Sequence, residues 1–209
     1  WPWQAEGMCG RYAAGRQPDQ LMEQFHIDHD GTGGRIPAPS YNVAPTTDVL
    51  TVVQAHDRRE LKVMRWCLVP SWSKDTSMAS HMINARAETA ATKPSFRHAF
   101  AKRQFCVIPA ESFFEPNYES GHAVRWKIAA ALDEPLAIAG LWEWRPHGGP
   151  QDQPLVSFTM LTINADGHPL MQRFHRPEEE KRMVVLLQSA QVDTWLHTSP
   201  ESVADYLQP

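Results

Sequence analysis

Apolar residues along this chain fall into short stretches that predict many strands and a few short helices. Most of these stretches are rich in β-branched and aromatic residues, which favour strands. Residues 18–26 differ, because Leu21, Met22 and Phe25 recur at helical spacing behind Pro18, which predicts a short amphipathic helix. The predicted strands are 49–55, 61–68, 104–109, 124–131, 136–142, 156–164 and 183–187, and further helices are predicted within 87–102, 168–174, 191–197 and 201–207.

Polar segments and segments rich in Gly or Pro separate these elements and predict turns and loops. The polar turn at 56–59 predicts a hairpin of the two strands beside it, and loops are expected at 28–39 and 144–154. About eight strands with no regular alternation of strand and helix favour an α+β fold on mainly antiparallel sheet. Because the chain has no internal repeat and no long linker, we predict a single domain with short flanking helices.

Composition and charge narrow the class of protein. The 209 residues are 42% hydrophobic and 21% charged, as in ordinary globular proteins, and the net charge is −4. Residues 1–105 carry 13 basic and 10 acidic side chains, against 7 and 14 in residues 106–209. Any anion-binding face is therefore expected to draw on the first half of the chain. No apolar run is long enough to span a bilayer, so no membrane partner is expected.

The three cysteines are odd in number and lack metal-ligand spacing, as do the histidines. We therefore expect no disulfide framework, no metal, no cofactor and a cytoplasmic location. Cys67 and Cys106 lie in apolar stretches and are predicted to be core residues.

Cys9 differs because it follows Met8 directly, as in a chain that starts there. Removal of Met8 would leave a free α-amine beside the thiol, and this pair can form an imine with an aldehyde and then close a ring. Gly10 allows close backbone approach to a ligand, and Arg11 offers a guanidinium suited to phosphate. Residues 1–7 match no predicted element, and we interpret them as a leader from an upstream start, a removable propeptide or a remnant that is not native to the protein. While they are attached, the Cys9 nitrogen is an amide and this chemistry is blocked.

Five segments carry polar residues with Gly or Pro where a structural element would not need them: 8–11, 41–45, 84–89, 113–115 and 175–177. In this order and spacing they resemble the SRAP family, the SOS response-associated peptidases or abasic-site processing proteins. The resemblance implies one barrel-like, β-rich domain over 8–209 with a basic groove for single-stranded DNA. It also implies a monomer that binds abasic sites in the DNA damage response.

The resemblance further implies the residue roles. Cys9 would bond the opened sugar of an abasic site as a thiazolidine, a DNA–protein cross-link that shields the lesion. Glu115 would move protons at the sugar oxygen and the amine, His175 would act on the opposite side, and Asn42 would position the amine. Arg11, Asn84 and Arg86 would lie at phosphates, and Pro45 and Trp72 would wedge against the neighbouring bases.

Other interpretations stay open from the residues alone. Cys9 and His175 also suit a cysteine peptidase or amidohydrolase whose substrate is the bond after Met8. Arg11, Arg86 and Trp72 alternatively suit a non-catalytic single-strand binder. At the level of single residues, Glu115 is equally a strand-end carboxylate, His175 a helix-terminal cation, Arg86 a partner of Glu88, and Trp72 the edge of a core. The chain departs from the family pattern at Pro116 and in the acidic stretch 177–182.

Overall fold

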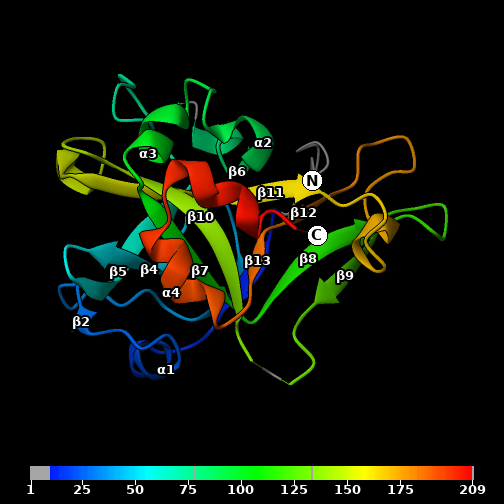
Figure 1. Ribbon diagram of the computed structural model, residues 1–209, viewed down its shortest axis with the longest axis horizontal. Coiled ribbons are helices and arrows are strands. Elements are labelled where there is room, and N and C mark those ends of the chain that lie inside the picture. Colours follow the sequence, from blue (N-terminus) through cyan, green and yellow to red (C-terminus); the bar gives the residue numbers. More distant parts are fainter. Residues whose placement is uncertain (1–9, 78, 133, 209) are drawn as a thin grey trace.

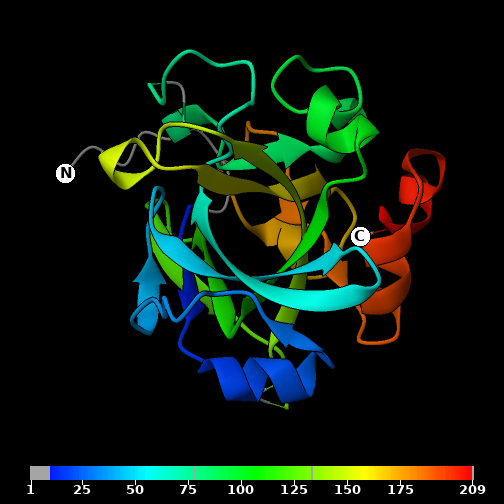
Figure 2. The same ribbon diagram turned by 90° about the vertical axis from the view of Figure 1, so that its left-hand side faces the viewer.

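The computed structural model describes residues 10–77, 79–132 and 134–208, and its centre is a closed ring of five strands. Neighbours around the ring pair antiparallel, except that the parallel pair of β5 with β11 closes it through Ser157 opposite Arg65 and Phe158 opposite Trp66. Figures 1 and 2 show the ring from two sides, and it confirms the barrel-like α+β prediction. In ring order the strands are β4 (Asp48–Ala55), β5 (Arg58–Trp66), β11 (Leu155–Asn164), β10 (Leu136–Arg145) and β7 (Phe105–Ala110).

These strands form where β-branched and aromatic residues cluster, and their buried side chains fill the barrel. Val52, Leu61, Ile108, Leu141 and Phe158 are fully buried. Short strands extend the same sheet, of which β6 pairs with β11 and β12 with the opposite edge of β11. They are β2 (His29–Asp30), β6 (Asn84–Arg86), β12 (Arg182–Val184) and β13 (Leu186–Leu187).

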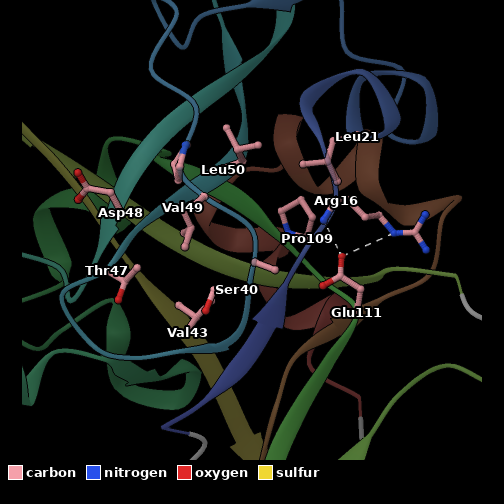
Figure 3. A pocket seen from close by; sticks show the side chains of 13 residues that line it. Arg16, Leu21, Ser40, Val43, Thr47, Asp48, Val49, Leu50, Pro109 and Glu111 are labelled. Carbon is pink, nitrogen blue, oxygen red and sulfur yellow. Dashed lines mark hydrogen bonds and ion pairs between the residues drawn. The ribbon is translucent and has the colours of Figure 1, made fainter.

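A second, four-stranded sheet in the order β3-β1-β8-β9 lies beside the barrel, and β8 and β9 extend to the right in Figure 1. Its strands are β1 (Tyr12–Ala14), β3 (Ser40–Val43), β8 (Ser112–Asn117) and β9 (Val124–Ile128). The chain passes from β7 to β8 through one residue, Glu111. The Glu111 carboxylate accepts hydrogen bonds from the backbone N–H groups of Gly15 and Arg16, at 2.7 and 3.0 Å. Figure 3 shows its contacts with Arg16. Glu111 therefore ties the segment after β1 to the junction of β7 and β8, beside a small cavity of about 30 Å³.

Short helices cover the ends and outer face of the barrel. Trp195 of α4 is fully buried, and its indole N–H donates to the backbone carbonyl of Cys106 at 3.0 Å. Among the described residues, no helix is long and apolar enough to cross a bilayer. The helices are α1 (Pro18–Gln24), α2 (Ala87–Ala90), α3 (Arg97–Ala101) and α4 (Gln191–His197), with 3-10 turns η1 (Ala79–His81), η2 (Pro150–Asp152), η3 (Met171–Arg173) and η4 (Pro200–Tyr206).

Several boundaries differ from the sequence prediction. The prediction of a strand over 61–68 is wrong at its end, because β5 stops at Trp66 and Cys67 has φ 99, outside the strand region. Cys67 is nevertheless fully buried, as predicted. The helical region 87–102 contains two separate helices, α2 and α3, with Pro94 in the turn between them.

Candidate functional site

Two of the predicted catalytic side chains, Glu115 and His175, lie together in the structure. Glu115 is in β8, and His175 follows η3, which an isolated bridge between Asn117 and Phe174 attaches to β8. The backbone N–H of His175 donates to the carbonyl of Pro116 at 3.0 Å. As a result, the His175 Nε2 atom lies 3.9 Å from the Glu115 Oε2 atom, and both side chains are almost completely buried.

The hydrogen bonds of His175 assign its tautomer. Its Nε2 lies 2.8 Å from the backbone carbonyl oxygen of Arg182, which can only accept, so Nε2 carries a proton. Burial is the largest influence on the His175 pKa and lowers it below its ordinary value. The hydrogen bond to the Arg182 carbonyl and the charge of Glu179 oppose this shift, and the positive charges of Lys181 and Arg182 add to it. The neutral imidazole therefore leaves Nδ1 as an unprotonated base.

Glu115 is shifted in the opposite sense. Burial raises the pKa of its carboxyl group well above the usual range, so the protonated acid is favoured. The two groups thus form a neutral acid beside a neutral base. A pair of titratable groups whose surroundings push their pKa values apart is typical of acid–base sites.

Each of these side chains also has a polar atom without a hydrogen bond. Among the described residues, neither the Glu115 Oε2 nor the His175 Nδ1 atom has a partner. Buried polar atoms are nearly always hydrogen-bonded in folded proteins, because desolvation without a partner is costly. Two such exceptions within one side-chain pair indicate atoms that act on something other than the resting protein.

The backbone at His175 is in a conformation that is costly for this residue. Its φ is 64°, in the left-handed region that L-residues with a side chain seldom adopt. Such a residue costs about 1–3 kcal/mol and persists only where the surroundings fix it. Here the bonds to Pro116 and Arg182 fix it, which holds the imidazole toward Glu115.

The start of the described chain runs toward the same pair. β1 pairs antiparallel with β8, with Tyr12 opposite Phe113, and the Phe114 N–H donates to the Arg11 carbonyl at 3.0 Å. The same register carried one step further sets Gly10 opposite Glu115. Arg11 is half-buried. Cys9, the predicted nucleophile, lies outside the described residues.

The predicted phosphate-binding residues Asn84 and Arg86 lie on β6, where an ion-pair network joins Arg86 to the histidine. The exposed Arg86 guanidinium lies 2.7 Å from a carboxylate oxygen of Glu180. Glu180 also contacts the buried Arg182 at 2.7 Å, and Arg182 contacts Glu88 at 2.8 Å. Arg182 therefore links the network to His175, whose ring it holds through its carbonyl. The alternative pairing of Arg86 with Glu88 is wrong. Asn84 itself is buried.

The other predicted residues are more scattered. Asn42 is exposed on the edge strand β3, one position before the buried Val43, and among the described residues no hydrogen bond joins it to Glu115 or His175. Pro45 is half-buried just after β3. Trp72 is 56% exposed, and its indole N–H donates to the Pro94 carbonyl at 3.1 Å, so it does not close a core.

The two described cysteines are poor nucleophiles. Both are fully buried free thiols. Burial raises the pKa of Cys67 to about 11 and also raises that of Cys106. Because the thiolate is the reactive form, neither is suited to catalysis. Among the described residues, no group of His, Cys, Asp and Glu side chains has a metal-binding arrangement.

Sequence reasoning did not find Arg182, Glu180 or Trp126 as neighbours of the site. Trp126 is directly opposite Glu115 across the β8–β9 pair. Its place depends on the register of that hairpin, for which the sequence gives no local signal beyond the strand itself.

Comparison with known proteins identifies the family from the sequence, and a solved structure has the same fold. The family model described as SOS response associated peptidase (SRAP) matches residues 8–209. The abasic site processing protein YoqW of Bacillus subtilis (strain 168) is 36% identical over 207 residues, covering 97% of this chain and 87% of that protein. The abasic site processing protein YedK of Escherichia coli (strain K12) is 30% identical over 165 residues, covering 76% and 69%. A crystal structure from Bordetella bronchiseptica aligns with a TM-score of 0.82 at 32% identity, covering 96% of this chain and 94% of that one.

Proposed function

The chain belongs to the SRAP family, and from that premise we propose that it processes abasic sites in single-stranded DNA by forming a covalent cross-link through Cys9. The observation that carries the proposal is the Glu115–His175 pair, a buried neutral acid and a buried neutral base at β8, the strand that pairs with β1. The names of the relatives, abasic site processing proteins, support the substrate.

The proposed chemistry needs only an amine, a thiol and proton transfers. The α-amine of Cys9 attacks the aldehyde carbon of the opened sugar, and the adduct loses water to give an imine. The thiol sulfur then adds to the imine carbon, its proton moves to the nitrogen, and a five-membered thiazolidine ring closes. One water leaves overall, and no electrons are gained or lost, so the reaction requires no cofactor.

Glu115 and His175 divide the proton transfers between them. The protonated Glu115 carboxyl gives its Oε2 proton to the departing hydroxyl, and the vacant His175 Nδ1 accepts a proton from the amine or the thiol. The His175 Nε2 proton stays on the Arg182 carbonyl and keeps the ring oriented. Asn42, on the strand that pairs with β1, is assigned to position the amine.

The DNA contacts follow the same proposal. Arg11 and Arg86 hold phosphates beside the lesion, with the buried Asn84 next to them, while Pro45 and Trp72 wedge against bases, in keeping with the exposed Trp72 ring. At Arg86 the Glu180 carboxylate occupies the guanidinium, and a phosphate has to displace it. The DNA is a single strand, and the protein acts as a monomer.

The free amine sets a condition on the chain. An amide nitrogen is delocalised into its carbonyl and cannot form an imine. We therefore propose that residues 1–8 are removed before the reaction. The family match, which begins at residue 8, supports a domain over 8–209 with 1–7 as a leader. Every described strand and helix lies within residues 12–206, so this removal deletes none of them.

A cysteine hydrolase that cleaves after Met8 is the second candidate, because a vacant His175 Nδ1 also suits activation of a thiol. It accounts for the peptidase in the family description. It needs no DNA and forms no lasting adduct, which separates the two proposals experimentally.

The test mixes the form that begins at Cys9 with an oligonucleotide carrying one abasic site. We expect a band that survives boiling in detergent with this DNA and none with undamaged DNA. Cys9→Ala and Cys9→Ser should lose the band and keep non-covalent binding, whereas Cys106→Ala, which removes a buried thiol, should keep it. An undiminished band from Cys9→Ala excludes Cys9 as the nucleophile. No band from the unaltered protein excludes the cross-linking proposal and leaves the cysteine hydrolase as the remaining candidate.

A further inference from the structure

Trp126 lies in an unusual position for a large aromatic side chain. It pairs directly with Glu115 across the β8–β9 ladder, so the two side chains are on the same face of the sheet. Phe113 and Glu115 on that face are buried, yet Trp126 is 39% exposed. An exposed indole next to a buried acid–base pair is more informative than an exposed apolar residue elsewhere.

The segment around His175 holds the Trp126 ring in place. The Phe174 ring meets it edge-on, with centroids 6.0 Å apart and planes at 68°. The Arg173 guanidinium lies 5.1 Å from its centroid in a cation–π contact. Trp126 is therefore an ordered ring at the surface, set by the two residues that precede the candidate base.

The positive charge of Arg173 beside the Trp126 ring is balanced by a carboxylate. Glu119 binds the Arg173 guanidinium with both carboxylate oxygens, each at 2.8 Å. Arg173 is thus neutralised and fixed, and contributes a flat surface more than a free positive charge. A second pair repeats the pattern beyond His175, where the Arg176 guanidinium lies 5.9 Å from the Tyr118 ring. Arg173 and Arg176, which precede and follow His175 in the sequence, thus each lie against an aromatic ring.

We propose that Trp126 is the stacking platform for the nucleobase next to the abasic site, a specificity-determining residue that rests on the function proposed above. An abasic nucleotide presents no base of its own, so its neighbours are the ligand groups with a π-face. Indole rings and guanidinium planes both stack on bases, and this contact is tolerant of sequence. The platform places the neighbouring base beside Glu115 and leaves the baseless sugar at the acid–base pair.

The test removes the two stacking partners separately and together. Trp126→Leu keeps apolar contact with Phe174 and removes the flat ring. A single strand with a tetrahydrofuran abasic analogue supplies a stable ligand, and second strands replace the 5′ or the 3′ neighbouring nucleotide with another analogue. We expect Trp126→Leu to weaken binding about 5- to 150-fold, the range for loss of one stacked base, without changing the salt dependence. Replacement of the stacked neighbouring nucleotide should weaken DNA binding by the unaltered protein to a similar extent. The same replacement should not weaken DNA binding by Trp126→Leu any further.

Matched variants make the result decisive. Trp126→Phe keeps a ring and should retain most of the affinity, and Trp126→Met serves in place of leucine if thermal unfolding shows that Trp126→Leu is not folded. Trp144→Leu changes another exposed indole, 48% exposed, on β10 of the barrel, and this variant should bind the DNA normally. The platform is overturned if the affinity losses multiply when both the Trp126 ring and the neighbouring base are removed. It is also overturned if Trp126→Leu binds with the affinity of the unaltered protein. Absence of any adduct from the unaltered protein with aldehydic abasic DNA overturns the proposed function instead.

Discussion

Glu115→Gln is expected to make the protein more stable at neutral pH while it stops efficient cross-linking. Glutamine has nearly the shape of the protonated acid and does not ionise. Burial raises the pKa of Glu115 above its unfolded value, near 4.5. The contribution of Glu115 to stability is therefore fully present below about pH 4.5 and is lost as the pH rises toward the folded pKa.

The magnitude follows from linkage. While the acid is protonated in the fold and ionised in the unfolded chain, each pH unit costs about 1.4 kcal/mol of unfolding free energy. Between pH 4.5 and pH 7 the cost reaches at most about 3 kcal/mol, which corresponds to about 6–12 °C in Tm for a domain of this size. Glu115→Gln avoids this cost, so its advantage over the unaltered protein should grow across that interval.

The assay is denaturant unfolding of both proteins from pH 4.5 to 8. The difference between their unfolding free energies is used, because the contributions of the other titrating groups cancel in it. Glu119→Gln is the matched control. The hydrogen bond from Arg173 lowers the Glu119 pKa, so its stabilisation is present above the unfolded pKa and is lost in acid. That variant should be less stable than the unaltered protein at neutral pH, the opposite sign. A Glu115→Gln difference that is flat with pH, or negative at pH 7, would refute the buried neutral acid.

The remaining predictions concern the reaction and the DNA contacts. His175→Ala should slow adduct formation about 10²- to 10⁴-fold in single-turnover assays with unchanged affinity, and a parallel loss of affinity would mean that His175 only shapes the groove. Arg86→Ala and Arg11→Ala should each lower the slope of log affinity against log salt by about one phosphate contact, and an unchanged slope would remove that residue from the DNA backbone. Glu180→Gln should tighten binding at low salt, because Arg86 no longer has to leave a carboxylate; weaker binding would contradict that competition.

The long strands could be predicted from sequence because β-branched and aromatic residues, which favour strands, occupy many of their positions. β4, β7 and β11 are of this kind. The short strands β1 and β6 could not be predicted in this way. The three residues of β6, Asn84–Arg86, carry no strand signal, and they form a strand only because β11 lies beside them. Closure of the barrel depends on one parallel contact between β5 and β11, which no local pattern indicates.

The site could be predicted only in part for similar reasons. Glu115 and His175 were selected through the family resemblance, and their proximity depends on the backbone bond between His175 and Pro116. The partner of Arg86 was not predictable, because Glu88 is the acidic residue near it in the sequence, whereas the fold brings the distant Glu180 to it. Trp126 was missed because its relation to Glu115 is set by hairpin register.

The central claim is that the free α-amine of Cys9 forms the cross-link, and the state of the N-terminus tests it most directly. The 209-residue chain and the form that begins at Cys9, each verified by intact mass, are mixed with the same aldehydic abasic strand, and the yield of boiling-resistant adduct is compared. The account predicts adduct from the Cys9 form and none from the chain that begins at Trp1. Equal yield from the intact Trp1 chain would contradict the amine route.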